Sequence, residues 1–296
     1  MTTPDLRALV EGATRILAEA GVPSPRHDAT ALAAHVLGQE RLELVLPPPV
    51  PDGFAEQFAG LVERRRLREP LQHLVGTTGF RYLTLLVEPG VFVPRPETEI
   101  VAQVAVDEAL RLPAPLVIDL CCGAGGIALS VATEVPAARV VAVDLSPEAV
   151  DLTRRNALAV GAEHVRVLHG DVADPALLSE LDGTVDVLVA NPPYIPPDAE
   201  PVEPEVRDHD PDLALYGGGL DGLEVPRAVL QAAARLLAPG GLLVMEHAEV
   251  QDEAARADAA ATGAFVDIES RPDLTGRPRM LVARRNAQPD VTDSAP

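Results

Sequence analysis

The sequence of 296 residues contains no lysine and no tryptophan, so all 24 basic residues are arginine. Acidic residues number 45, which leaves a formal net charge of −21. A chain with this charge is repelled by a phosphate backbone, and we therefore expect no direct binding of nucleic acid. Asparagine occurs only at Asn156, Asn191 and Asn286, which gives weight to any asparagine found within a motif.

Cysteine is almost absent, because the only two, Cys121 and Cys122, are neighbours. Adjacent cysteines cannot close a long loop within one chain, nor can they supply four zinc ligands. The seven histidines show no HExxH-like spacing, so we predict no metal site. No uncharged apolar run reaches the roughly 18 residues of a membrane helix, and acidic residues interrupt the apolar pattern of the N-terminus. We expect a cytoplasmic, monomeric protein without a membrane anchor or signal peptide.

Apolar residues recur at helical spacing in the first part of the chain. The pattern covers residues 6–17 and 30–37, with a proline-containing break between them. The proline-rich run 46–51 predicts the end of another helix, and a further helix continues to about Arg68. We assign residues 1–75 to a helical domain.

Two short β-type runs follow on either side of a turn at 88–90, and they predict a β-hairpin in a linker of residues 76–93. Farther along, short apolar runs alternate with helical stretches, which is typical of parallel β-α-β units in a doubly wound α/β sheet. The predicted strands are Leu116–Leu120, Arg139–Val143, Val165–Leu168, Val185–Ala190, Gly241–Glu246, Phe265–Ile268 and Met280–Ala283. We assign residues 94–285 to this domain and 286–296 to a flexible polar tail.

The first of these strands leads into a glycine-rich turn, Cys121-Cys122-Gly123-Ala124-Gly125. Such a turn at the carboxyl end of a parallel strand lets a ligand approach the backbone closely. Residues 123–128 also fit the loose dinucleotide pattern G-x-G-x-x-A, so a nicotinamide or flavin enzyme is an alternative. Asp119 favours S-adenosylmethionine, because a carboxylate there repels a pyrophosphate but suits the ammonium group of a methionine moiety. The alternative role for Asp119 is to cap the turn.

Two further acids follow the next two strands and point to the same edge of the sheet. Asp144 ends its strand where a carboxylate accepts both ribose hydroxyls of either cofactor. Asp171 is expected near the adenine, with a local helix cap as the alternative.

Asn191-Pro192-Pro193-Tyr194 follows the fourth strand and is the most specific motif in the chain. The two prolines fix the backbone and remove two donors, so the carbonyl groups there only accept hydrogen bonds. The Asn191 side chain adds an acceptor, and Tyr194 offers an aromatic face. This combination predicts a site that accepts both protons of a planar NH2 group and stacks on its plane. A proline-rich turn without a ligand is the alternative.

These motifs resemble those of the release factor glutamine methyltransferases, the HemK-like protein-(glutamine-N5) methyltransferases that use S-adenosylmethionine. The matching stretches are Pro94-Arg95-Pro96-Glu97-Thr98-Glu99, Asp119–Gly125, Val143–Ser146, Asn191–Tyr194 and Gly217–Leu223. Asn-Pro-Pro-Tyr alone is shared with methyltransferases of adenine, whereas the first and last stretches narrow the resemblance to this family.

The resemblance implies a class I, Rossmann-like methyltransferase domain with a small N-terminal helical domain that recognises the protein substrate. The implied reaction methylates the side-chain amide of a glutamine in the Gly-Gly-Gln loop of peptide chain release factors, which act in translation termination. We assign catalysis to Asn191, Pro192 and Tyr194, with Pro193 completing the substrate site. The expected cofactor residues are Asp119, Cys121, Cys122, Gly123, Ala124, Gly125, Asp144, Asp171, Val172 and Asn191.

The chain departs from the family at a few positions. Cys121 and Cys122 stand where the family usually has Gly-Thr, and Val172 stands where some members have an aromatic residue. Ala248 replaces a usual glycine. Because cysteine is small and fits β-region backbone angles, we expect the cofactor turn to keep its function.

Other functions stay open on the sequence alone. They are an adenine-amino methyltransferase of nucleic acid, a diverged paralogue that methylates another protein, and a non-catalytic or nicotinamide-binding module. The long segment 195–216 is interpreted as a wall or lid of the substrate cleft. The arginine cluster 64–68 is interpreted as a solvated helix face, with contact to an acidic or RNA-bearing partner as the alternative.

Overall fold

The computed structural model describes residues 5–287 and divides into two units. One unit consists of the residues up to Thr77 together with Pro201–His209. The other runs from Thr78 to Glu200 and from Asp210 onward. From residue 288, the tail predicted for 286–296 lies outside the described residues.

The first unit is helical. Its N-terminal part contains α1 (Leu6–Glu19), α2 (Pro25–Val36), α3 (Phe54–Arg66) and α4 (Leu71–Val75). The apolar faces of these helices share one core, in which Leu17 and Leu32 are fully buried. Burial of one apolar face per helix is what the predicted spacing requires.

The helix predicted before the proline-rich run is wrong. Residues 37–53 contain no helix. Gly38, with φ of 65°, follows the end of α2. Four prolines within residues 47–51 then lack the amide hydrogens and the backbone freedom that a helix needs.

The segment Pro201–His209 contributes the short helix α8 (Pro204–His209) to the first unit. Glu205 lies in a buried ion cluster, where Arg68 Nε and Nη2 contact its oxygens at 2.8 and 2.6 Å. Arg65 lies 2.8 Å from the same carboxylate and 2.7 Å from the buried Asp28. Burial raises the pKa of Glu205, but the hydrogen bonds from Arg68 and Arg65 outweigh it and bring this pKa to about 2.

The remaining arginines of the cluster 64–68 are also paired. Arg64 contacts Glu69, and Arg66 contacts Glu63 on the surface of α3. All four arginines therefore have carboxylate partners within their own unit, which opposes the alternative of an acidic or RNA-bearing partner at this cluster.

The second unit is built on a seven-stranded sheet in the order β5-β4-β3-β6-β7-β9-β8. The strands are β3 (Leu116–Leu120), β4 (Arg139–Asp144), β5 (Arg166–His169), β6 (Val185–Ala190), β7 (Leu237–Glu246), β8 (Phe265–Pro272) and β9 (Pro278–Arg285). The five strands from β5 to β7 in this order are parallel, whereas β9 and β8 are antiparallel. Each predicted strand is present, so the predicted α/β class is confirmed.

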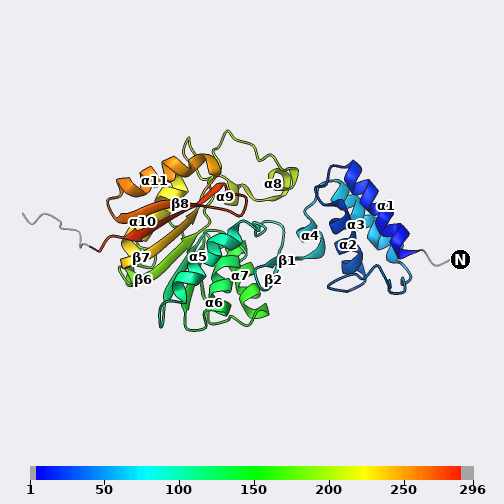
Figure 1. Ribbon diagram of the computed structural model, residues 1–296, viewed down its shortest axis with the longest axis horizontal. Helices are drawn as coiled ribbons and strands as arrows, with labels where there is room; N and C mark the ends of the chain where they lie inside the picture. The colour runs from blue at the N-terminus through cyan, green and yellow to red at the C-terminus, as the bar shows by residue number, and fades with distance from the viewer. Residues whose placement is uncertain (1–4, 288–296) are drawn as a thin grey trace, which may run out of the picture. The chain divides into compact units, whose positions relative to one another are not determined.

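Helices cover both faces of the sheet (Figure 1). One face carries α5 (Thr98–Ala109), α6 (Gly126–Glu134) and α7 (Pro147–Ala159), and the other carries α10 (Glu224–Leu236) and α11 (Asp252–Ala261). Shorter helical turns are α9 (Asp212–Leu215), η1 (Ser179–Leu181) and η2 (Glu249–Gln251). Along β3, Val117 packs into the core beneath α5–α7 and Ile118 into the opposite one. Because strand side chains alternate, Asp119 lies on the α6 side.

A two-stranded hairpin, β1 (Thr77–Phe80) and β2 (Leu83–Leu86), precedes the sheet. Its turn lies at Arg81 and Tyr82, so the hairpin predicted around residues 88–90 is wrong. A turn does form there, with the Val91 N–H donating to the Glu88 carbonyl at 3.3 Å, but residues 91–93 form no strand. Arg81 adopts φ of 52°, and its guanidinium donates to both carboxylate oxygens of Glu134 on α6, each at 2.7 Å. This tertiary contact, which has no local sequence signal, ties the hairpin turn to α6.

Asn156 ties the hairpin to the glycine-rich turn. Its side chain accepts a hydrogen bond from the backbone N–H of Leu86 at 2.7 Å and donates to the carbonyl groups of Leu86 and Ala124. This asparagine is fully buried and satisfies three backbone groups, which gives it a structural role.

We predict that Arg65→Ala lowers the free energy of unfolding of the helical unit by about 3 kcal/mol, because the buried Asp28 loses its partner. Hydrogen exchange of the α1 and α2 amides measures this loss. Arg66→Ala is the matched control, since its ion pair with Glu63 is exposed, and it should change the exchange little. Equal effects of the two substitutions would contradict the prediction.

Candidate active site

The register of the central strands brings the predicted cofactor and substrate motifs to one edge of the sheet. Leu120, the last residue of β3, pairs with Val143 of β4 and with Ala190 of β6. Asp144 and Asn191 follow those two partners directly. The glycine-rich turn therefore lies between them at the carboxyl end of the parallel strands, where open α/β sheets bind ligands.

Asp119 is fully buried beside the glycine-rich turn. Its Oδ2 accepts a hydrogen bond from the backbone N–H of Ala128 at 2.9 Å, whereas its Oδ1 has no partner among the described residues. Burial raises the pKa of Asp119 to about 8; the Ala128 N–H opposes the rise and Asp144 adds to it. A buried carboxylate oxygen without a partner fits a cationic ligand such as the ammonium group of S-adenosylmethionine.

Asp144 is held by two backbone donors. Its Oδ2 accepts from the N–H of Gly123 at 2.8 Å, and its Oδ1 accepts from the N–H of Ser146 at 2.9 Å. Burial raises the pKa of Asp144, although these backbone hydrogen bonds partly lower it. Each oxygen keeps a lone pair for a further donor, so the carboxylate fits a ribose diol.

Cys121 adopts a left-handed backbone conformation with φ of 60°, contrary to the β-region angles expected for it. The chain reverses here from β3 into the turn, and the next residue donates its N–H to the Val143 carbonyl at 3.0 Å. Non-glycine residues are strained in this conformation, which agrees with the glycine that the family resemblance leads us to expect at this position. Burial and neighbouring carboxylates raise the pKa of both cysteine thiols, so the pair is protonated and unreactive.

Asp171 lies near the same turn, close enough to raise the pKa of the Cys121 thiol. Its Oδ1 accepts a hydrogen bond from the Ala173 N–H at 2.8 Å, so it stabilises a local turn. Val172 is half-buried against the core beneath α10. The predicted roles of these two residues in cofactor binding stay predictions.

The Asn-Pro-Pro-Tyr motif is held by the segment that follows it. The Leu215 carbonyl accepts hydrogen bonds from the N–H groups of Tyr194 and Ile195, at 3.2 and 2.8 Å. The Gly217 N–H donates to the Ile195 carbonyl at 3.1 Å, so the two ends of the long segment 195–216 are paired. The role of this segment as a wall or lid stays a prediction.

Two glycines allow a close backbone approach to the motif. A Cβ atom on Gly217 would lie 2.6 Å from the Pro193 carbonyl oxygen, and one on Gly222 would lie 2.3 Å from the Tyr194 carbonyl oxygen. Both distances exclude any side chain. The stretch Gly217–Leu223 therefore packs directly against the backbone of the Asn-Pro-Pro-Tyr motif.

Three polar residues without a role in the sequence prediction also hold the motif. Gln251 Nε2 donates to the carbonyl groups of Tyr194 and Asp221, at 2.8 and 3.0 Å. Thr98 and Glu246 form a buried pair near Asn191. Two features of the sequence could have pointed to Thr98 and Glu246. Thr98 lies within the family-like stretch 94–99, and Glu246 is a charged residue at the end of an apolar strand.

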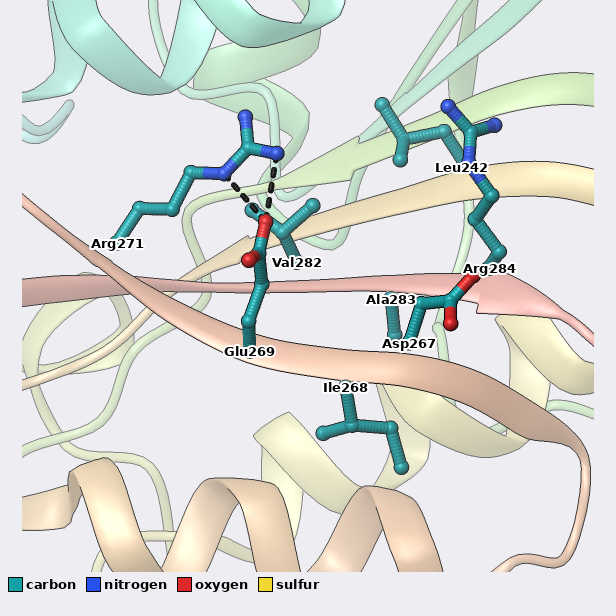
Figure 2. Close-up of a pocket in the computed structure, with 8 residues that line it drawn as sticks. All are labelled: Leu242, Asp267, Ile268, Glu269, Arg271, Val282, Ala283 and Arg284. Atoms are coloured by element: carbon teal, nitrogen blue, oxygen red, sulfur yellow. Dashed lines mark hydrogen bonds and ion pairs between the residues drawn. The ribbon is translucent and has the colours of Figure 1, made fainter.

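A separate hollow lies over the antiparallel edge of the sheet (Figure 2). It is lined by β7, β8 and β9, with the Glu269–Arg271 ion pair on its surface. None of its lining residues belongs to the motifs described above. Among residues 5–287, no cluster of potential metal ligands occurs, and no helix has both the length and the apolar character for crossing a membrane.

Comparison with known proteins identifies both parts of the chain. Residues 8–76 match the family model "PrmC N-terminal domain", and residues 83–202 match "Methyltransferase small domain". With the fold, these matches define an S-adenosylmethionine-dependent methyltransferase, and they set aside the nicotinamide and flavin alternative.

Curated relatives specify the family. The release factor glutamine methyltransferase of Mycolicibacterium smegmatis is 49% identical over 96% of this chain and 99% of its own length. Those of Streptomyces coelicolor and Bifidobacterium longum are 48% and 44% identical, over 95% and 93% of this chain and 98% of each relative. The chain belongs to the release factor glutamine methyltransferase family, and the resemblance predicted from its motifs is confirmed.

We predict that Cys121→Gly raises the free energy of unfolding by up to about 1 kcal/mol, because the left-handed strain that glycine removes exceeds the extra chain entropy that glycine loses on folding. Urea denaturation measures the change. Cys122→Gly is the control: its side chain is buried and its φ is not positive, so that substitution should destabilise the protein. A destabilised Cys121→Gly variant would show that residue 121 is not strained.

We predict that Asp119→Asn stabilises the ligand-free protein at pH 8.5 and weakens S-adenosylmethionine binding at least about tenfold, since it removes the charge that attracts the ammonium group. The folded carboxyl keeps its proton up to about pH 8, whereas its usual pKa is 3.8. The stability of the parent protein therefore falls as the pH rises between these values.

The stability of the Asp119→Asn variant does not fall in this way. Its free energy of unfolding should therefore exceed that of the parent protein only slightly at pH 4 and most at pH 8.5. Urea denaturation at both pH values and calorimetric titration with S-adenosylmethionine test the two halves of the prediction. A stability difference independent of pH would exclude the buried charge as its cause.

Proposed function

We propose that this protein transfers the methyl group of S-adenosylmethionine to the side-chain amide nitrogen of the glutamine in the Gly-Gly-Gln loop of peptide chain release factors. The observation that carries the proposal is the position of Asn191, directly after Ala190, the strand partner of Leu120. The acceptor motif thus opens at the sheet edge that carries the cofactor acids. The names of the relatives supply the release factor as substrate.

An amide nitrogen is a poor nucleophile because its lone pair is delocalised into the carbonyl group. The bound cofactor supplies an electrophilic methyl group on a sulfonium. The Asn191 Oδ1 and the Pro192 carbonyl accept the two amide protons of the substrate and aim the nitrogen lone pair at that methyl group. Tyr194 packs on the amide plane. Such alignment contributes several kcal/mol to a displacement reaction.

We also propose that the two units have different functions. The helical unit, expected over residues 1–75, recognises the release factor, and the protein acts as a cytoplasmic monomer that does not bind nucleic acid. The net charge of −21 and the internal pairing of the arginines in the cluster 64–68 support a protein partner over a phosphate backbone.

Transfer of label from S-adenosylmethionine tests the substrate. The reaction contains a purified release factor, the same factor with its loop glutamine replaced by alanine, or a DNA and RNA mixture. Label in the first protein alone is expected. Label in nucleic acid would support an adenine methyltransferase instead. Label in the release factor that carries alanine in its loop would show that the methyl group goes to a residue other than the loop glutamine.

We predict that Asn191→Ala lowers kcat at least about 100-fold, because one of the two acceptors that orient the amide is lost. Cofactor affinity, measured by calorimetry, should fall far less than the rate. Asn286→Ala, the same substitution outside the motif, serves as the control. Full activity of the Asn191→Ala enzyme would refute the proposed chemistry.

A further inference from the structure

Hydrogen bonds connect Asn191 of the Asn-Pro-Pro-Tyr motif to Thr98, and Thr98 to Glu246. Thr98, in the first turn of α5, donates its hydroxyl proton to Glu246 Oε2 at 2.8 Å. Asn191 Nδ2 donates to the same Thr98 oxygen at 3.2 Å. Thr98 is 5% exposed and Glu246 is 1% exposed, so water competes little for these hydrogen bonds.

The direction of these hydrogen bonds follows from the donor inventory. An ionised carboxylate only accepts, so the single proton of the Thr98 hydroxyl must point to Glu246. The Thr98 hydroxyl oxygen can then only accept a second hydrogen bond, and the Asn191 NH2 group donates it. The carbonyl oxygen of Asn191 is consequently turned away from Thr98 and is available as an acceptor.

We propose that Glu246, acting through Thr98, is the positioning residue that fixes the rotation of the Asn191 side-chain amide and thereby presents Oδ1 to the substrate NH2 group. This inference rests on the proposed function, since it assigns the acceptor that the glutamine amide requires. The Tyr194 hydroxyl donates to Glu246 Oε1 at 3.4 Å. One carboxylate therefore orients both ends of the motif.

The arrangement makes amide orientation depend on the charge of Glu246. Burial raises the pKa of Glu246 to about 7, with Glu97 adding to the rise and Thr98, Arg279 and Tyr194 opposing it. A protonated Glu246 can donate to Thr98, whose hydroxyl can then donate to Asn191. This reversed hydrogen bond favours the opposite rotation of the Asn191 side-chain amide, in which its NH2 group faces the substrate.

The groups that face Glu246 come from four directions. Glu97 and Thr98 lie at the start of α5, Tyr194 lies in the motif after β6, and Arg279 lies on β9. His247 is its neighbour at the end of β7, and burial lowers the pKa of this imidazole, which stays neutral near pH 7. Of the groups whose pKa is shifted here, Glu246 is the one that titrates near pH 7.

Methylation of the release factor by Thr98→Val, Thr98→Ser and Glu246→Gln enzymes tests the proposal. Thr98→Val keeps the shape of the side chain but removes the hydroxyl, so kcat should fall at least about tenfold while the Kd for S-adenosylmethionine changes little. Thr98→Ser restores the hydroxyl and should recover most of the rate. Thr133→Val, a threonine whose hydroxyl bonds only to the backbone of α6, is the matched control.

The pH profile separates positioning from a general structural role. At saturating S-adenosylmethionine, whose ammonium group holds Asp119 ionised, kcat of the parent and Thr98→Ser enzymes should fall as the pH falls through about 7. The kcat of Thr98→Val and of Glu246→Gln should lack this acidic limb. An unchanged kcat for Thr98→Val, or an acidic limb that persists in Glu246→Gln, would overturn the proposal. If Thr98→Val does not fold, the Glu246→Gln profile decides.

The two levels of inference fail differently. If the parent enzyme places no label in the release factor glutamine, the proposed function is wrong. If the parent enzyme methylates that glutamine and the variants keep its rate and pH profile, only the role of Glu246 and Thr98 is wrong.

Discussion

The parallel pairing of β3 with β4 on one side and β6 on the other is the constraint on which the site depends. It places three chain segments, far apart in sequence, in adjacent positions at one sheet edge. Asp119 and the glycine-rich turn come from the first, Asp144 from the second and Asn191 from the third. A shift of register by one residue would send these side chains to opposite faces.

The Asn-Pro-Pro-Tyr motif needs support that its own sequence does not provide. Two prolines restrict the backbone of Asn191–Tyr194, but the direction in which it runs is fixed by Gly217, Gly222 and Gln251. Each contacts the motif through backbone carbonyl groups. A rigid acceptor site thus results from close backbone packing on one side and a buried polar network on the other.

The strands and the fold class could be predicted from the sequence, because short apolar runs alternate with helical stretches, and the candidate site could be predicted because its motifs follow the ends of those strands. The supporting residues could not. Thr98 and Glu246 lie 148 positions apart, and nothing local in either segment indicates that they meet. The β-region angles expected for Cys121 are also wrong, although the glycine that the resemblance implies at this position indicated a left-handed turn.

The hairpin shows the same limit on a smaller scale. Glu88-Pro89-Gly90 forms the turn that its composition indicates, yet the two strands of the hairpin are joined at Arg81 and Tyr82. Arg81 in that turn is paired with Glu134, on a helix about fifty residues away in the chain. Local composition indicates the turn at residues 88–90, but it does not indicate which segments pair as strands.

The ion cluster around Glu205 bears on how this enzyme can be recombined with its relatives. The polypeptide enters the helical unit twice, once at the N-terminus and again at Pro201–His209, where Arg65 and Arg68 hold the second passage. A chimaera that exchanged only the N-terminal residues would leave this carboxylate facing unfamiliar side chains. Exchanging the whole helical unit for that of another family member therefore requires three crossovers in the gene, one after the N-terminal helices and one at each end of the nine-residue segment Pro201–His209.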